Sequence, residues 1–315
     1  MVDFSLIIST RNRAARLGKC LAAISQLRTH GDWELVIVDN AATDDTAAVI
    51  REFKRQAPMA VLATYEAKPG LGRARNRGLS VARGNIVGFT DDDCYPTPDY
   101  IDGILDIFRD REIGYAGGRI KLFNPRDWPI SIVDKAETRI IEPFTYIDGP
   151  EMKILGANMA FRRAVLKQIG GFDDALGAGG PFAFEDVDAF ARASFAGWKG
   201  GYFPEPTVLH DHGRDKESAR LLARSYAIAR GAYFTKFILR RNSAPLYAKE
   251  WILRSARECL LRPRDILQEM GGAVAYLCHC ASHKHSRRDV SSQAGRSARS
   301  TVESRTLRDA PYRLD

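Results

Sequence analysis

Short apolar runs alternate with segments of helical periodicity in the first part of the chain. The runs FSLIIS (residues 4–9) and WELVIVD (residues 33–39) are rich in β-branched and aliphatic side chains, which predicts strands. Apolar residues recur every three or four positions between these runs, which predicts a helix. The apolar positions of that helix are Leu17, Leu21, Ile24 and Leu27. Near-continuous apolar strands joined through a helix are typical of a parallel sheet covered on both faces.

The same alternation continues to residue 93. Residues 40–53 predict a polar turn followed by a helix, and residues 59–66 predict a third strand. A glycine-punctuated segment, 68–84, leads into a short basic helix, and residues 85–93 predict a fourth strand. The sequence therefore predicts an open α/β sheet, in which ligands bind beyond the carboxyl ends of the strands.

Beyond residue 96 the pattern predicts further strands and helices, interrupted by one long irregular excursion. Residues 124–150 are rich in proline and charge, and we expect them to pass over the acidic edge of the sheet. The other predicted elements are an amphipathic helix at 98–110, a strand at 114–123, a strand, helix and turn at 156–174, a helix with acids in its first turn at 184–198, and a last strand at 200–213.

The composition of the chain changes near residue 216. Apolar residues recur at three-to-four spacing among many arginines, which predicts basic amphipathic helices. The last residues are polar, rich in Ser and Arg and almost free of aromatics, which predicts disorder. We therefore divide the chain into an α/β domain at 1–215, a basic helical extension at 216–282 and a disordered polar tail at 283–315.

Positive charge is concentrated in the C-terminal third. The net charge is +8, but residues 211–315 hold 21 Lys and Arg against 11 Asp and Glu, whereas residues 1–210 hold 26 against 28. This asymmetry favours an anionic partner, either a membrane surface or nucleic acid. A solvated helix face explains it equally well.

Cysteine usage favours a reducing compartment. The five cysteines form no Cys-x-x-Cys pair, so we expect no disulfide framework and favour the cytoplasm. Cys278 and Cys280 flank a histidine, but no second ligand pair stands at a usual zinc spacing. The N-terminal apolar run lacks the features of a signal peptide, and the apolar segment 271–281 is too short to span a bilayer. We expect no membrane-spanning segment.

Carboxylates stand at the ends of two predicted strands. Asp39 ends the second strand, and Asp91, Asp92 and Asp93 end the fourth. Adjacent like charges behind a buried strand need a cation or strong hydrogen bonds. Mg²⁺ or Mn²⁺ bridging a diphosphate to these carboxylates would suit the arrangement. The alternative is that one acid caps the following turn and the others face water.

Six segments occur in the order and approximate spacing seen in family 2 glycosyltransferases, so the chain resembles that family over about residues 4–212. The segments are SLIISTRNR, ELVIVDNAATDDT, GLGRARNRGLSVARG, VGFTDDDCYPTPDYI, LGANMAFRRAVLKQIGGFDD and FEDVDAFARASFAGW. The resemblance implies the GT-A (nucleotide-diphospho-sugar transferase) fold, with a central, mostly parallel sheet flanked by helices and a C-terminal helical appendage. It makes residues 1–215 the catalytic domain of an inverting, metal-dependent enzyme with a nucleotide-sugar donor, UDP-sugars being favoured.

The resemblance implies a nucleotide pocket at the ends of the first two strands. Ser9, Thr10 and Arg11 are expected to line it, although Ser9 and Thr10 could instead cap the following helix. Asp39 is expected to hydrogen-bond the base, commonly uracil in this family. A plain turn-forming role before Asn40 is the alternative.

Four further positions are expected near the donor. Arg75 and Asn76, with Arg73, lie in the segment that matches the family pattern near the nucleotide, where a guanidinium can pair with phosphate. The arginines could equally lie on a solvated helix face. Asn158, in the Gly-Ala-Asn segment, is expected to contact the donor sugar or the acceptor.

The family's Asp-x-Asp metal motif falls on Asp91 and Asp93. Asp93 is expected to bind the metal directly, and Asp91 to bind ribose or reach the metal through water. The register of the motif can shift by one residue, so Asp92 is kept among the nucleotide-sugar-binding residues. His210 is expected to complete a site for Mn²⁺ or Mg²⁺, with an ordinary strand-end histidine as the alternative.

The Glu-Asp pair in FEDVD resembles the catalytic acids of the family. Inverting transfer needs a base that takes the proton of the attacking acceptor hydroxyl. Asp186 is expected in that role, and Glu185 is expected to orient the acceptor or to act as the base in its place. The alternative is that both acids simply favour the helix N-terminus through its dipole.

The segment after FEDVD lacks Gln-x-x-Arg-Trp, which is usual in processive members of the family, and this favours single addition. We expect a glycan or lipid-linked acceptor and peripheral contact with the anionic inner face of the cytoplasmic membrane. Two other functions stay open, a nucleotidyltransferase and a non-catalytic basic binding module. The first strand is not followed by a glycine-rich phosphate loop, and the aromatics among the C-terminal arginines have the spacing of a buried helix face, so neither nucleotidyl transfer nor nucleic-acid binding is favoured.

Overall fold

The predicted α/β sheet is the centre of the protein. A computed structural model describes residues 2–149 and 154–294, with side chains described up to residue 282. The sheet has the strand order β3-β2-β1-β4-β8-β6-β9-β5, and β7 pairs with β9. Its strands are β1 (Phe4–Thr10), β2 (Trp33–Asp39), β3 (Ala60–Tyr65), β4 (Ile86–Asp91), β5 (Cys94–Pro96), β6 (Ile113–Leu122), β7 (Arg139–Ile141), β8 (Asn158–Arg162) and β9 (Lys199–His210).

The first four strands run parallel, and their register brings the predicted strand ends together. Thr10 pairs with Asp39 between β1 and β2, and Ser9 pairs with Asp91 between β1 and β4. Strand β8 runs antiparallel to both β4 and β6, and β9 runs parallel to β6. The carboxyl ends of β1, β2, β4, β6 and β9 therefore meet at one edge of the sheet.

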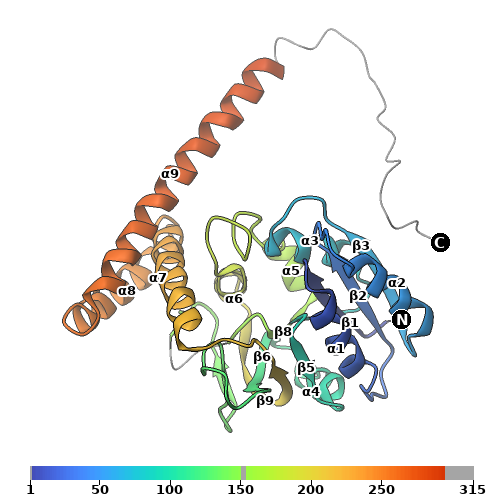
Figure 1. Cartoon of the computed structure of the whole chain (residues 1–315). Helices are drawn as coiled ribbons and strands as arrows, with labels where there is room; N and C mark the ends of the chain where they lie inside the picture. The colour runs from blue at the N-terminus through green and yellow to red at the C-terminus, as the bar shows by residue number, and fades with distance from the viewer. Residues whose placement is uncertain (1, 150–153, 295–315) are drawn as a thin grey trace. The chain divides into compact units, whose positions relative to one another are not determined.

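Helices cover both faces of the sheet (Figure 1). Right-handed crossovers carry α1 and α2 along one face and α3 along the other. On the α3 side, α5 packs against α6, and on the other side α1 packs against β5 and α4 against β9. The bounds are α1 (Ala14–Ile24), α2 (Thr46–Gln56), α3 (Leu71–Val81), α4 (Tyr100–Ile107), α5 (Arg163–Ile169) and α6 (Glu185–Phe195). This confirms the predicted class, a mostly parallel central sheet flanked by helices.

The C-terminal region is a separate helical unit. The chain divides into two compact units, residues 1–221 and 222–315. The helices at the C-terminal end are α7 (Lys216–Ile238), α8 (Ala244–Glu258) and α9 (Pro263–Ala294). Helix α7 begins where the helical extension was expected to begin, and α9 continues past the expected limit at 282 into the predicted polar tail. Residues 295–315 of that tail lie outside the described residues.

A buried carboxylate organises the helical unit. Glu269 on α9 is fully buried and accepts hydrogen bonds from Arg230 on α7 (3.0 Å), and from Trp251 (3.1 Å) and Arg254 (3.4 Å) on α8. The backbones of α7 and α9 touch where Gly231 faces the carbonyl group of Glu269, so no Cβ fits at that glycine. The predicted amphipathic helices are thus folded around a polar centre.

None of the helices in the part of the chain that the structure describes has the length and apolar character needed to cross a bilayer.

We predict that Glu269→Ala destabilises the helical unit by about 3 kcal/mol, because it removes the buried carboxylate that accepts hydrogen bonds from Arg230, Trp251 and Arg254. Urea unfolding followed by circular dichroism measures this. Glu258→Ala is the matched control: it removes a partly exposed carboxylate that also pairs with Arg254 (3.0 Å), and about 0.5 kcal/mol is expected. Equal effects of the two substitutions would contradict the central role of Glu269.

Candidate active site

The acidic triplet lies at the carboxyl edge of the sheet. Asp91 is the last residue of β4, and Asp92 and Asp93 form the turn that leads into β5. Asp92 and Asp93 are 4% and 2% exposed, whereas the side chain of Asp91 keeps about a third of its surface open (35%). Burial of two adjacent carboxylates requires compensating charge close by.

Two arginines at the start of α1 supply that charge. Arg13 donates to Asp92 (2.9 Å) and to Asp93 Oδ2 (2.8 Å), and Arg16 donates to Asp93 Oδ2 (3.1 Å). Neither arginine was expected from the sequence. The sequence does hold a usable signal, the basic segment that follows β1. Because β1 and β4 are parallel neighbours, that segment lies next to the acids that follow β4.

The surroundings of the two buried acids shift their pKa values in opposite directions. Burial raises the pKa of the Asp92 carboxyl to about 6, against the opposing charge of Arg13 and the hydrogen bond from Thr10. Burial acts in the same direction on Asp93, but the hydrogen bond and charge of His210, with the charges of Arg13 and Arg16, outweigh it and hold the pKa of Asp93 well below its usual range. Asp93 is therefore the permanent negative charge of this edge.

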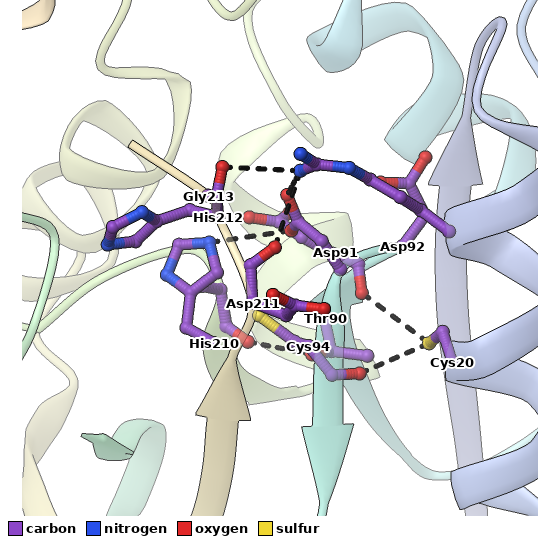
Figure 2. Close-up of polar contacts among 12 residues, drawn as sticks. Cys20, Thr90, Asp91, Asp92, Cys94, His210, Asp211, His212 and Gly213 are labelled. Carbon is purple, nitrogen blue, oxygen red and sulfur yellow. Dashed lines mark hydrogen bonds and ion pairs between the residues drawn. The ribbon is translucent and has the colours of Figure 1, made fainter. Parts of the chain in front are cut away.

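His210 ends β9 beside the acids, as expected. Its Nε2 lies 3.4 Å from Asp93 Oδ1, and its buried Nδ1 has no hydrogen-bond partner among the described residues. One atom each of Asp91, Asp93, Cys94 and His210 could bind the same ion, and these four atoms lie within 4.8 Å of one another. Figure 2 labels Asp91, Cys94 and His210 of this group. Two carboxylates, an imidazole and a thiol make a chemically suitable set of ligands for a divalent metal. The residues present therefore fit the metal that the resemblance implies.

His212 is held away from the acids by other partners. It accepts a hydrogen bond from the Arg214 backbone (3.0 Å), and its Nδ1 lies 3.5 Å from Asp127. Asp127 also accepts a hydrogen bond from the Gly213 backbone (2.8 Å). Because Asp127 belongs to the irregular excursion, that segment does reach the end of β9.

A second group of acids lies at the start of α6 and is joined to the first by Arg75. This buried guanidinium donates to Glu185 (2.6 Å) and lies 3.6 Å from Asp91. Burial raises the pKa of the Glu185 carboxyl to about 7, with the charge of Asp186 adding to the effect and that of Arg75 opposing it. Arg75, which we expect near the nucleotide, lies between carboxylates of the two groups.

Asp186 is oriented by backbone groups. Its Oδ2 accepts a hydrogen bond from the Gly156 N–H (2.6 Å), and its Oδ1 accepts one from Val187 (2.8 Å). A Cβ at Gly156 would come within 2.9 Å of Asp186 and 2.8 Å of Arg75, so a larger residue there would displace the ends of both side chains. Unlike Glu185, Asp186 is half-buried, which leaves its carboxylate accessible to a substrate.

The residue before this pair is in an unfavourable backbone conformation. Phe184 precedes α6 with φ +77° and ψ 31°, the left-handed region, which costs a non-glycine residue roughly 1–2 kcal/mol. Such strain is retained where the surrounding structure requires it and is common next to functional groups.

The residues expected in the nucleotide pocket lie at the same edge. Asp39 is buried and accepts a hydrogen bond from the Ala42 backbone (2.9 Å), so it also shapes the turn after β2. Thr10 donates to Asp92 (2.6 Å), and the buried hydroxyl of Ser9 has no hydrogen-bond partner among the described residues. Arg11 is exposed.

Two expected contacts of the donor hold the protein together. Asn76 donates to the Phe172 carbonyl (2.8 Å) and to Asp174 (2.9 Å), which fastens the loop after α5 to α3. Asn158 donates to the carbonyl groups of Arg119 and Pro206, both at 2.9 Å, and so joins β6 to β9.

The segment that builds this edge of the sheet has known relatives. Residues 5–170, more than half of the chain, match the family model of glycosyl transferase family 2. The chain belongs to this family. The expected family and the expected type of enzyme, a glycosyltransferase, are thereby confirmed.

Similar proteins agree with this assignment. An uncharacterised glycosyltransferase of Nostoc sp. is 30% identical to this glycosyltransferase chain over 138 residues, which are 44% of this chain and 42% of that protein. The chain spans less than two thirds of the length of the first curated relatives it matches.

Solved structures share the fold. The mannosyltransferase PcManGT of Pyrobaculum calidifontis, in complex with GDP-Man and Mn²⁺, has a TM-score of 0.61 and 20% identity, covering 87% of this chain and 86% of that one. TarS 1–349 of S. aureus, in complex with UDP-GlcNAc, has a TM-score of 0.62 and 17% identity, covering 86% and 79%. These similarities confirm the GT-A fold of this family 2 glycosyltransferase.

We predict a pH-dependent loss of stability that Glu185 causes. Because its pKa is raised to about 7 in the folded protein, its contribution to stability is complete below about pH 4.5 and is lost as the pH rises through 7. Between those values the wild type should lose on the order of 3 kcal/mol relative to Glu185→Gln. Urea unfolding of both proteins at several pH values measures this. Parallel stability curves would show that the Glu185 carboxyl titrates normally.

Proposed function

We propose that this glycosyltransferase moves one sugar, with inversion and in a metal-dependent reaction, from a nucleotide-sugar donor to a hydroxyl of a glycan or lipid-linked acceptor. The observation that carries the proposal is the meeting of two groups of acids at one sheet edge. One group, with Asp93 and His210, suits a metal and a leaving diphosphate, and the other, Glu185 and Asp186, suits proton transfer. Arg75 holds the two at a defined separation.

The nucleotide would bind over the ends of β1 and β2. Asp39 remains the proposed partner of the base, with Ser9, Thr10 and Arg11 lining the pocket. Asn12 supports this arrangement, because its side chain accepts a hydrogen bond from the Thr43 backbone (2.6 Å) and so joins the loops after β1 and β2. Donor binding would therefore meet a preformed pair of loops.

The metal would be held by Asp93 Oδ1 and His210 Nε2, with Asp91 beside them. When bound, a divalent ion neutralises the charge that develops on the departing nucleoside diphosphate. Oδ2 of Asp93 is already engaged by Arg13 and Arg16, which leaves Oδ1 as the oxygen that faces His210. The presence of Mn²⁺ with PcManGT supports a divalent ion, and the choice between Mn²⁺ and Mg²⁺ is part of the test below.

Asp186 is the proposed base. It would take the proton of the acceptor hydroxyl while that oxygen forms its bond to the anomeric carbon, and the bond between that carbon and the diphosphate oxygen breaks. Attack from the side opposite the leaving group inverts the anomeric centre. Two backbone hydrogen bonds fix the carboxylate, and its half-exposed position lets an acceptor reach it. Glu185, buried against Arg75, would position Asp186 rather than touch the acceptor.

The donor is proposed to be a UDP-sugar. TarS was solved with UDP-GlcNAc and PcManGT with GDP-Man, so the fold is compatible with either base. Membership in family 2 supports glycosyl transfer over nucleotidyl transfer. Single addition rests on the missing Gln-x-x-Arg-Trp segment.

We predict that Asp186→Asn binds donor normally but lowers the transfer rate by about 10²- to 10⁴-fold, because only the proton acceptor is lost. Asp93→Ala should instead abolish stimulation by Mn²⁺ or Mg²⁺. Donor binding by calorimetry and release of nucleoside diphosphate from a panel of UDP- and GDP-sugars measure these effects.

The matched control for both variants is Asp106→Asn, which changes an exposed carboxylate on α4 that pairs only weakly with Arg109. It should behave like the wild type. If no nucleotide sugar binds, or if Asp186→Asn turns over normally, the proposed mechanism is wrong. Release of pyrophosphate in place of nucleoside diphosphate would indicate nucleotidyl transfer.

We also propose that the helical unit docks on an anionic membrane surface. Leu260 and Leu261, in the turn between α8 and α9, are 90% and 81% exposed. Arg257, Arg262 and Arg264 around them are exposed as well. In such a turn the apolar side chains can insert between lipid headgroups, and the arginines are attracted to anionic lipid.

We predict that the full chain co-sediments with phosphatidylserine-containing vesicles at low salt and not with neutral phosphatidylcholine vesicles. The double variant Leu260→Ser/Leu261→Ser should bind at least tenfold more weakly while keeping its helical content, because the loss of buried CH₂ groups weakens insertion. Equal binding of the variant and the wild type would refute docking through this turn.

A further inference from the structure

A cysteine thiol lies among the proposed metal ligands. Cys94 begins β5 and pairs with His210 across the antiparallel strands β5 and β9. Directly opposed residues of such a pair project to the same side of the sheet, so the thiol and the imidazole are neighbours. Cys94 Sγ lies within 4.8 Å of a ligand atom of Asp91, of Asp93 and of His210, and the residue is fully buried (Figure 2).

The spacing of these atoms suits one small ion. Two nitrogen or oxygen ligands of a tetrahedral ion, each about 2.0–2.2 Å from it, are roughly 3.3–3.6 Å apart. Asp93 Oδ1 and His210 Nε2 are 3.4 Å apart, with no ion in the structure. All four ligand atoms lie within 4.8 Å of one another, so a bound ion would draw the others closer together.

The backbone around Cys94 is held in place from two sides. The Asp211 N–H donates to the Asp93 carbonyl group (2.8 Å), which locks the turn to β9. The buried thiol of Cys20, on α1, donates to the Cys94 carbonyl group (3.1 Å) and lies 3.7 Å from that of Asp91 (Figure 2). Cys20 thus supports the strand, whereas the Cys94 thiol belongs to the ligand cluster.

We propose that Cys94 is a metal ligand, which makes this a mixed oxygen, nitrogen and sulfur site that holds thiophilic ions such as Zn²⁺ and Co²⁺ more tightly than Mg²⁺. The inference rests on the metal site of the proposed function and goes beyond it by naming a fourth ligand and the class of ion. Thiolate is a soft ligand and selects zinc-like ions, whereas Mg²⁺ is bound through oxygen and keeps much of its water. Binding displaces the thiol proton to solvent.

The test uses the full chain with the three more accessible cysteines replaced, Cys259→Ser, Cys278→Ser and Cys280→Ser, so that only the buried thiols of Cys20 and Cys94 remain. Co²⁺ is added, and the near-ultraviolet charge-transfer absorption of a cobalt–thiolate bond is recorded. Zn²⁺ and Mg²⁺ affinities are measured by competition with a chromophoric chelator. Each variant is checked by circular dichroism.

We expect the cobalt–thiolate band in this protein, its loss in Cys94→Ser and in Cys94→Ala, and its retention in Cys20→Ser. Cys94→Ser should bind Zn²⁺ at least tenfold more weakly, with Mg²⁺ affinity changed less than twofold. Co²⁺ binding without the band, or Zn²⁺ affinity unchanged in both Cys94 variants, would overturn the role of Cys94 and leave the metal site standing. If Asp93→Ala does not alter the binding of any ion, the metal dependence of the proposed function fails as well.

Discussion

The candidate site depends on the neutralisation of carboxylates that are buried at one edge of the sheet. A carboxylate removed from water is unstable as an anion unless opposite charge or hydrogen bonds lie against it. Here arginines supply that charge from two directions: Arg13 and Arg16 from the start of α1, and Arg75 from α3. The acids can therefore stay close together without any ligand, and the edge is organised before a substrate arrives.

The same balance between burial and nearby charge gives chemically similar carboxyl groups different proton affinities. Asp93 is kept ionised by His210 and two guanidinium groups, while burial makes Asp92 and Glu185 bind protons more readily. Asp186 differs again, because backbone N–H groups hold it and solvent reaches it. The environment of each carboxyl group, and not its residue type, therefore determines how readily it binds a proton and how far solvent reaches it.

Periodicity was sufficient to predict the strands that bear these groups. The runs ending at Asp39 and Asp91 are continuous and apolar, and the register of parallel strands necessarily brings their ends together. Partners from distant segments could not be predicted in the same way. Arg75 and Asn76 are adjacent in a basic helix, yet one turns inward between acids and the other fastens a loop, because tertiary packing decides which side of a helix is buried. Cys94 was missed because its relation to His210 exists only through the pairing of β5 with β9.

The position of Arg75 has a consequence for how such a chain can change. Its guanidinium donates to Glu185 and to the carbonyl group of Gly156 and lies 3.6 Å from Asp91, and a Cβ at residue 156 would press against it. A substitution at any of these positions alters the packing or the charge of the others, so their effects should not be additive. In evolution or in directed redesign, residues 75, 156 and 185 should therefore change together or not at all. Changes of specificity are expected more readily in the surrounding loops.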